Sequence, residues 1–429
     1  MNVELQSVPF DPAEAKAALS QLPASPAVFA LYGADAKDEP YIGRTPNLRG
    51  RLERLLQASA RHPRRLQLAA RVRRIAYRLT GSDFESLLAQ FSLLEEVYGA
   101  KVLERMHLRA PAFVRFLGSN PYPRIVVTHK PSLREADWAY GPFASRTAAE
   151  RFADEMLKLF LLRRCTDDLN PDPSHPGCVY SEMKMCLAPC YKGCSDERYA
   201  EESAAVQDFL ATRGDSRLVV LRAERDAASE NLAFEDAAAL HAQVQKAEAV
   251  RALAPELVQP MSRLRALILQ ASADPDEVAV FLYQNGRLRG PVGFSTIGMR
   301  IQNEHSGSSS LFAQPMALEP VPETPVTENS TPASDILNQG TETPLKIPRT
   351  MLEARMEVVL EELGKNVGPP SATLRQGHLA LLKRWYYRPE VKREGEICFP
   401  DAKGNWQIKS LMRSAGRIAA KRLAQSNPQ

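Results

Sequence analysis

Two short apolar stretches, Pro26-Ala-Val-Phe-Ala-Leu-Tyr32 and Tyr41-Ile-Gly43, lie on either side of a polar turn near the start of the chain. Each predicts a β-strand, because aromatic and branched residues are bounded by Gly and Pro. Patterns typical of helices follow over 47–56 and 82–98. Residues 1–105 are therefore expected to form a small α/β domain.

The remainder of the chain divides by composition. Residues 197–252 contain mostly helix formers and predict two helices. Asn285-Gly286 between two apolar runs predicts a β-hairpin with a type I′ turn. The expected segments are a connecting α/β stretch (106–164), a cysteine-rich region (165–200), a helical hairpin (201–255), strands (256–302), a disordered linker (303–350) and a basic helical tail (351–429). The predicted fold class is therefore α+β, with several domains.

Composition excludes several classes of protein. The chain has 429 residues, more than one hydrophobic core usually accommodates, and a formal net charge of only +4. It contains no run of eighteen apolar residues, so no membrane span is expected. The first residues lack the pattern of a signal peptide, which favours a cytoplasmic location. Five of the six cysteines fall between 165 and 194, which in that compartment indicates metal binding rather than disulfides.

One region of the chain is strongly basic although the net charge of the whole is small. Between Arg44 and Arg78 there are eleven arginines and a single acid, Glu53. Such a run can be a solvated helical face, but arginine also matches phosphate oxygens with a planar fork. We expect DNA to be the partner of this region. The arginines expected to contact phosphates are Arg49, Arg54, Arg64, Arg65, Arg73 and Arg74.

Four cysteines form the second chemical pattern, Cys165-x12-Cys178-x7-Cys186-x3-Cys190. Four thiolates at uneven spacing suit a [4Fe–4S] cluster, whose corners the chain must reach from several directions. Structural zinc is an alternative, although such sites normally contain paired Cys-x2-Cys knuckles. Thiols without a ligand are the third reading.

The N-terminal pattern resembles a known nuclease domain. Ala27-Val-Phe29, Tyr41-Ile-Gly43 and Asn47-Leu-Arg-Gly-Arg51 are similar to the GIY-YIG domain that begins the excinuclease subunit UvrC and its shorter relative Cho. The likeness continues in order through about residue 300. The later segments that carry it are Asn120–Thr128, Tyr140–Phe143, Leu159–Cys165, Cys178–Tyr180, Cys186–Cys190 and Asn231–Ala238.

The resemblance implies a catalytic centre, but several of its positions are substituted. Tyr41 matches the family's second tyrosine and Arg51 its arginine, whereas Phe29 replaces the first tyrosine. Arg44 stands for the lysine, and Gln90 for the glutamate that holds Mg²⁺ or Mn²⁺. A neutral amide is a poor sole ligand for a hard cation. The sequence therefore predicts a degenerate nuclease site, with a metal ion needed only if cleavage survives.

The same resemblance implies a cofactor and a protein partner. The four cysteines match the positions that hold a [4Fe–4S] cluster in UvrC. Residues 222–250 are similar to the UVR hairpin that binds a UvrB-type protein, although an ordinary amphipathic helical hairpin explains the same pattern. The residues expected to pack on one face of it are Leu221, Leu232, Phe234, Ala238 and Val244.

The C-terminal part resembles only the opening strands of the RNase H-like domain of UvrC. His378 is the only histidine after His305, so a second nuclease centre is not expected. Trp385, Tyr386 and Tyr387 either stack on unpaired bases or form the edge of a core. The expected function is that of a UvrC/Cho-like subunit in nucleotide excision repair. The alternatives are a non-catalytic repair accessory protein and an iron–sulfur DNA-binding regulator.

Overall fold

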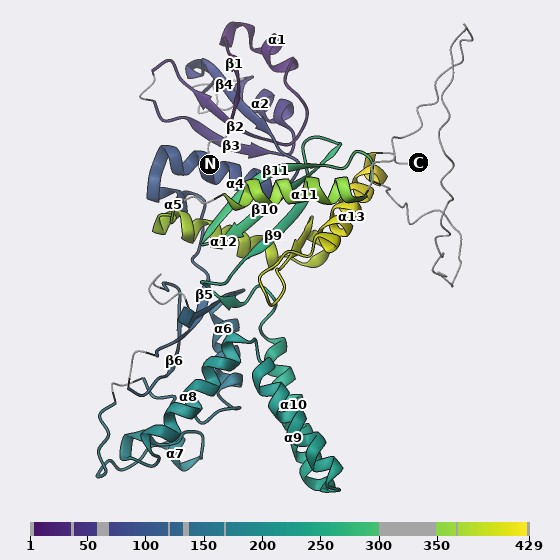
Figure 1. Cartoon of the computed structure of the whole chain (residues 1–429). Coiled ribbons are helices and arrows are strands. Elements are labelled where there is room, and N and C mark those ends of the chain that lie inside the picture. Colours follow the sequence, from purple (N-terminus) through teal and green to yellow (C-terminus); the bar gives the residue numbers. More distant parts are fainter. Residues whose placement is uncertain are drawn as a thin grey trace, which may run out of the picture.

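The computed structural model describes residues 4–35, 38–57, 68–118, 121–131, 137–166, 169–299, 349–365 and 368–426. Within these residues the fold mixes helices with three small antiparallel sheets of four strands each (Figure 1). The predicted α+β class is confirmed at this level. No helix in these ranges is long and apolar enough to cross a membrane.

The first sheet has the strand order β1-β4-β2-β3. Its elements are β1 (Gln6–Pro9), β2 (Ala27–Tyr32), β3 (Tyr41–Thr45) and β4 (Arg74–Leu79), with helices α1 (Ala15–Ser20) and α2 (Leu48–Leu56). Both helices share a core with the side of β2 that presents Phe29. The Asn47 side chain starts α2 by accepting a hydrogen bond of 2.8 Å from the Gly50 N–H.

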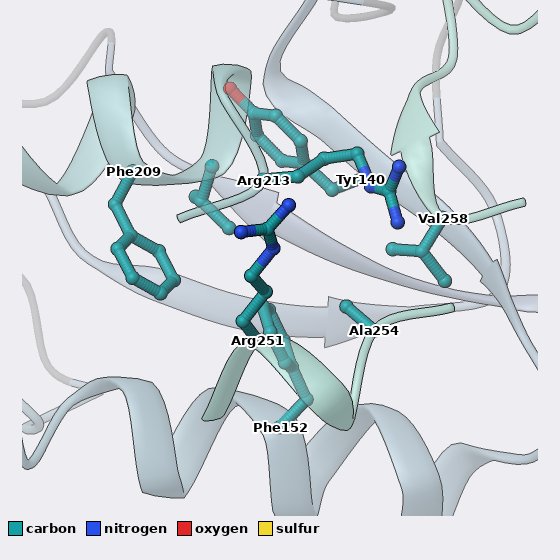
Figure 2. Close-up of a pocket in the computed structure, with 8 residues that line it drawn as sticks. Tyr140, Phe152, Phe209, Arg213, Arg251, Ala254 and Val258 are labelled. Atoms are coloured by element: carbon teal, nitrogen blue, oxygen red, sulfur yellow. The ribbon is translucent and has the colours of Figure 1, made fainter. Parts of the chain in front are cut away.

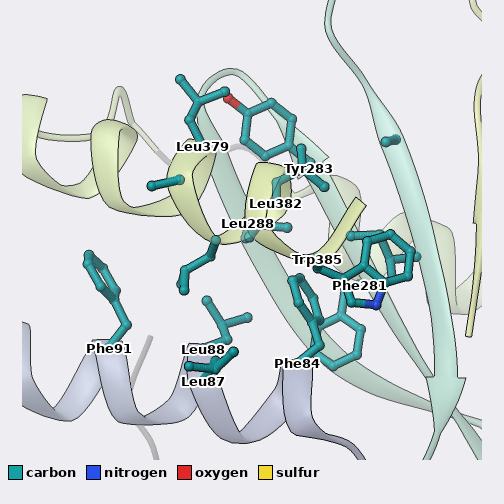
Figure 3. Packing of buried hydrophobic residues seen from close by; sticks show 14 of the residues in the cluster. Phe84, Leu87, Leu88, Phe91, Phe281, Tyr283, Leu288, Leu379, Leu382 and Trp385 are labelled. Carbon is teal, nitrogen blue, oxygen red and sulfur yellow. The ribbon is translucent and has the colours of Figure 1, made fainter. Parts of the chain in front are cut away.

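Helix α4 (Asp83–Tyr98) packs against both the first sheet and the C-terminal part of the chain. Ala89 and Leu93 pack against Val28 of β2. Phe84 and Phe91 belong to the core cluster that the C-terminal part supplies (Figure 3). Because apolar residues cover so much of this helix, it is buried between the two layers rather than amphipathic.

The middle sheet has the order β6-β5-β7-β8 and packs on helices α6 and α8. Its strands are β5 (Ala112–Phe116), β6 (Ile125–Thr128), β7 (Ala139–Phe143) and β8 (Gln259–Pro260). The helices of this part of the chain are α5 (Val102–Arg105), α6 (Arg146–Met156), α7 (Val179–Glu182) and α8 (Asp196–Ala211). Phe143, Phe152 and Phe209 lie in one buried cluster. This core supports the loop that carries the cysteines.

The prediction of two helices over 197–252 is wrong, because the segment forms three. Helix α8 is followed by α9 (Asp215–Glu230) and α10 (Phe234–Ala252). The first break falls at Arg213 and Gly214, with φ of 54° and 90°, and the second at Leu232, with φ of 57°. A left-handed residue ends a helix, and only the glycine signals this in sequence. Helices α9 and α10 project from the molecule as a hairpin (Figure 1).

The C-terminal sheet has the order β11-β10-β9-β12. Its elements are β9 (Ala266–Ala271), β10 (Glu277–Gln284), β11 (Arg287–Ser295) and β12 (Glu396–Cys398), with α11 (Arg349–Gly364), α12 (Ala372–Tyr386) and α13 (Ile408–Ser426). The predicted turn is confirmed, with φ of 51° at Asn285 and 77° at Gly286. Strand β12 pairs with β9, so residues before and after the expected linker complete one sheet. Nearly all of that linker lies outside the described ranges.

Candidate functional site

Phe29 and Tyr41 lie on neighbouring strands at the centre of the N-terminal pattern. Their ring centroids are 6.1 Å apart. Phe29 is fully buried, whereas 39% of Tyr41 is exposed. Gly43 is paired with Phe29, and a Cβ atom on it would lie 2.8 Å from the Phe29 Cζ atom. The ring at position 29 is therefore a closely packed core group, and only Tyr41 offers a hydroxyl to solvent.

Arg44 points to the other side of the sheet from Tyr41. Tyr41 is paired with Leu31, which lies in the core with α2, whereas Arg44 is paired with Val28, which packs against α4. Successive side chains of a strand alternate between faces, and the register follows that rule. Arg44 forms an ion pair with Asp83 at the start of α4.

Asp83 also pairs with Arg388, which follows α12, at 2.6 Å. Burial alone would raise the pKa of the Asp83 carboxyl, but the hydrogen bond from Arg388 and the charge of Arg44 outweigh it. The net effect is a lowered pKa. The position that corresponds to the family's lysine is thus tied into a group of three charges from distant parts of the chain.

Arg51 and Gln90 lie on different helices. Arg51 is on α2, on the side of the sheet that carries Phe29, and Gln90 is half-buried on α4. Glu85, one turn before Gln90, is 4% exposed and accepts a hydrogen bond of 2.8 Å from the Gly81 N–H. Burial raises the pKa of this carboxyl. In the part of the chain that the structure describes, no three His, Cys, Asp or Glu side chains are grouped as a single-ion site.

The described arginines of the basic region make contacts within the domain. Arg49 donates from Nε to the Leu22 carbonyl at 2.7 Å, and Arg54 to the Gly50 carbonyl at 2.9 Å. Arg73 donates to two backbone carbonyls, and Arg74 covers the Tyr32 ring at 4.0 Å. Arg73 and Arg74 are nevertheless exposed. Arg64 and Arg65 lie outside the described residues.

The four predicted cysteine ligands all line one small cavity. They reach it from different segments, with Cys178 at the start of α7 and Cys190 in the turn Pro189–Tyr191. Arg163 and Arg164 line the same cavity. Cys194, the fifth cysteine of this region, instead packs against the middle-domain core.

Two donors face the sulfur atoms of this cavity. The Ala188 N–H donates to Cys186 Sγ at 3.3 Å, and Arg163 Nη1 lies 3.5 Å from Cys165 Sγ. Burial raises the pKa of Cys186 to about 11, and the neighbouring thiols add to the effect. Backbone donation from Ser181 lowers the pKa of Cys178. Sequence reasoning missed Arg163 and the Ala188 amide, and only the adjacency of Arg163 to Cys165 could have indicated the former.

The tip of the α9–α10 hairpin differs from its prediction. Leu221 and Val244 are buried between the helices, as expected. Ala238, predicted to pack on that face, is exposed. Leu232 and Phe234, also predicted to pack there, are 71% and 66% exposed. They lie at the turn, where the second helix has not yet come alongside the first. That part of the prediction is wrong, and the turn presents two large apolar side chains to solvent.

The basic aromatic stretch of the tail is the edge of a core. Trp385 is 2% exposed and donates to the Glu394 carbonyl at 3.0 Å. Tyr386 and Tyr387 are partly buried against the same cluster, and the Tyr387 hydroxyl donates to the Pro142 carbonyl. His378 is buried, and its Nδ1 accepts the Leu288 N–H at 2.9 Å.

A pocket at the base of the α9–α10 hairpin contains two guanidinium groups above aromatic walls (Figure 2). Arg251 forms an ion pair of 2.8 Å with Asp215. The Nε atom of Arg213 is buried without a hydrogen-bond partner among the described atoms. Phe152, Phe209 and Tyr140 form the apolar side of the pocket.

Comparison with known proteins relates the chain to one family. The family model for the UvrC/Cho excinuclease middle domain matches residues 113–209, which include the four cysteines and most of helix α8. The UvrABC system protein C of Sphingopyxis alaskensis is 33% identical over 227 residues, which are 52% of this chain and 34% of that protein. The protein of the same name from Aromatoleum aromaticum is 30% identical over 247 residues, 57% of this chain and 40% of that protein.

A longer match is with the UvrABC system protein C of Ruminiclostridium cellulolyticum, 28% identical over 303 residues, 68% of this chain and 47% of that protein. The aligned region thus spans less than half the length of these curated relatives. No solved structure matches the chain. The class that these matches define is that of proteins with a UvrC middle domain. The chain belongs to the UvrC/Cho excinuclease family, through its middle domain.

Proposed function

We propose that this protein is a DNA-binding subunit of nucleotide excision repair, built on the UvrC scaffold, whose N-terminal GIY-YIG-like domain does not cut DNA. The observation that carries the proposal is the environment of Phe29 and Arg44, which stand at two positions that are catalytic in GIY-YIG nucleases. Phe29 is fully buried and has no hydroxyl, and Arg44 contacts Asp83 on the side of the sheet opposite Tyr41.

Cleavage of a phosphodiester requires an activated water, a divalent cation and a cation beside the developing charge. In this chain Tyr41 and Arg51 would remain near the phosphate and could orient it. Gln90 supplies no charge for Mg²⁺ or Mn²⁺, and Glu85 is occupied by the Gly81 N–H and by Arg78 at 3.6 Å. The domain is therefore better suited to binding a DNA phosphate than to cleaving the phosphodiester bond.

The test is a nicking assay on a lesion-bearing duplex with Mn²⁺ and a UvrB-type partner. Wild type is compared with Tyr41→Phe/Arg51→Ala and with the restoring variant Phe29→Tyr/Arg44→Lys/Gln90→Glu. We expect no incision by wild type. Incision that the Tyr41→Phe/Arg51→Ala variant loses would refute the proposal, and incision by the restoring variant alone would support it strongly.

We propose that Cys165, Cys178, Cys186 and Cys190 hold a [4Fe–4S] cluster. Support comes from the cavity that all four line and from the donors that face Cys186 and Cys165, because hydrogen bonds to the sulfurs are one of the means by which a protein tunes such clusters. Structural zinc is the alternative, and the spacing disfavours it because zinc sites normally contain paired Cys-x2-Cys knuckles, which these four cysteines lack. The cluster would supply a structural crosslink between the segments that bear the four thiolates.

Anaerobic purification followed by visible spectroscopy and by iron, sulfide and zinc analysis tests this assignment. We expect about four iron and four sulfide per chain, reduced in Cys186→Ser and unchanged in Cys194→Ser. A colourless protein with one zinc would contradict the cluster. Cys194 is the matched control because it belongs to the same region but packs elsewhere.

We also propose that the α9–α10 hairpin, including residues 222–250, binds a UvrB-like protein. The exposed Leu232 and Phe234 at its turn support this, because large apolar residues on a projecting element commonly anchor a partner. Arg222 and Glu248 form an ion pair of 2.5 Å between the two helices, away from the turn. The C-terminal sheet with α11–α13 is proposed as an RNase H-like remnant in which His378 supports the edge strand β11.

A further inference from the structure

Helix α13 carries a row of positive charge that none of the functions above uses. Its 19 residues include no Asp or Glu. Lys409, Arg413, Arg417 and Lys421 follow one another at intervals of four and are all exposed. Four residues of an α-helix rise about 6 Å, so the row extends for roughly 18 Å along one ridge. We call these four residues the α13 ridge.

The opposite side of α13 is firmly attached to the domain. Leu411, Ala415 and Ile418 are buried against the C-terminal sheet and α11. Arg422 donates to the carbonyls of Ser272 and Asp274 at 2.6 Å, which fixes the last turns of the helix. The α13 ridge is therefore presented on a rigid element, and its cations are held at regular spacing.

The carboxylates near the α13 ridge are few. Glu396 of β12 pairs with Arg417, so the charge of this arginine is partly compensated. Arg413 donates only to the Lys409 carbonyl of its own helix among the contacts that the structure shows. The neighbouring α11 exposes Glu357, Glu361 and Glu362. The positive field is thus a narrow track rather than a broad face.

We propose that the α13 ridge binds the phosphate backbone of duplex DNA, and this inference rests on the proposed DNA-binding function. A track of about 18 Å lies alongside roughly five phosphates of one strand of B-DNA. An anionic membrane would instead favour a wide basic face with exposed aromatic or apolar anchors, which the ridge residues do not supply. Among the described residues of the N-terminal domain, Arg44, Arg49, Arg73 and Arg74 are engaged with a carboxylate, backbone carbonyls or the Tyr32 ring.

The test is the salt dependence of affinity for a 30-base-pair duplex of random sequence, measured by fluorescence anisotropy with the full chain. The ridge variant is Lys409→Gln/Arg413→Gln/Lys421→Gln, which leaves Arg417 with Glu396. Its matched control is Lys16→Gln/Lys101→Gln/Lys130→Gln, which removes three exposed charges from other elements. Glutamine is a good helix former, so α13 is expected to remain folded.

Three lost phosphate contacts should make the slope of log K against log salt shallower by about 2.7 in the ridge variant. The control should keep the wild-type slope, and a charge-keeping variant, Lys409→Arg/Arg413→Lys/Lys421→Arg, should keep it too. A ridge variant with the wild-type slope would overturn the ridge assignment while leaving DNA binding intact. Wild type that binds no DNA would overturn the proposed function itself. A parallel assay measures binding to anionic lipid vesicles. If the ridge variant loses vesicle binding but keeps its affinity for DNA, the choice of DNA as the partner is wrong.

Discussion

Arg388 and Asp83 are 305 residues apart in the chain, yet their side chains form an ion pair of 2.6 Å. Asp83 simultaneously binds Arg44, so one carboxylate joins the first sheet, α4 and the segment after α12. Because about a third of each side chain remains exposed, water weakens these ion pairs. The three charges nevertheless connect the N-terminal domain to the C-terminal part at a defined point.

Removal of this carboxylate should destabilise the protein. We expect Asp83→Asn to lower the free energy of unfolding by about 1–2 kcal/mol, because two guanidinium groups lose their partner. Its pKa is lowered in the folded state, so the contribution is present above the unfolded value near 4 and is lost as pH falls through the folded value. Urea unfolding at pH 7 and at low pH measures both effects. Glu224→Gln, at an exposed position in the middle of α9, is the control and should change the free energy of unfolding by less than about 0.5 kcal/mol.

The two arginines should not act independently. Each can still neutralise Asp83 when the other is removed, so Arg44→Gln and Arg388→Gln should each cost little. The double variant leaves the carboxylate without either partner and should cost about 0.5–1 kcal/mol more than the sum. A double-mutant cycle in urea gives this coupling directly. Additive costs would show that the shared carboxylate does not couple the two domains.

Glu85 should tolerate a neutral isostere. Its side chain is buried, and burial raises its pKa although the Gly81 N–H and Arg78 oppose the shift. Glu85→Gln keeps an oxygen for Gly81 and removes the cost of burying charge, so we expect a change within about 1 kcal/mol at pH 7. Glu85→Ala leaves the Gly81 N–H without its acceptor and should cost about 1–3 kcal/mol. Equal effects of the two variants in thermal unfolding would contradict this account.

His378 should make the protein sensitive to mild acid. Burial, with a contribution from the charge of Arg287, lowers its pKa from about 6.5 to about 3. The unfolded chain therefore takes up the proton first, and stability is lost as pH falls from about 6.5 towards 3. The expected slope is about 1.4 kcal/mol per pH unit. His378→Leu should remove that slope and cost about 1–3 kcal/mol at pH 7, because the Leu288 N–H loses its acceptor.

Substitutions at the turn of the α9–α10 hairpin should affect partner binding without affecting the stability of the fold. Leu232→Ser and Phe234→Ser should each change the free energy of unfolding by less than about 0.5 kcal/mol, because both side chains are largely exposed. Leu221→Ala, between the helices, should cost about 2–3 kcal/mol. If the turn anchors a UvrB-like partner, the two serine variants lose that complex in calorimetric titration. Wild-type affinity in both variants would show that the partner binds elsewhere.

Local patterns predicted much of the secondary structure. Strands β2 and β3, helix α4 and the turn at Asn285 all lie where composition and capping placed them. These features depend on neighbouring residues, so the sequence carries their signal directly. The break at Leu232 was missed because a leucine in a left-handed conformation has no local signature. The resemblance to a helical hairpin over 222–250 implied a turn within this segment, but not which side chains that turn would expose.

The sequence by itself determined which chemical groups the protein has: no hydroxyl at Phe29, no carboxylate at Gln90 and four closely spaced thiols. The functional groups of a chain are fixed by its residue types, whatever fold it adopts. Only the tertiary structure decided how those groups are used. It directed Arg44 to Asp83, engaged arginines of the basic region with carbonyls and brought four thiols to one cavity. The physical reason is that direction and distance arise from packing between distant segments, as the contact of Arg388 with Asp83 illustrates.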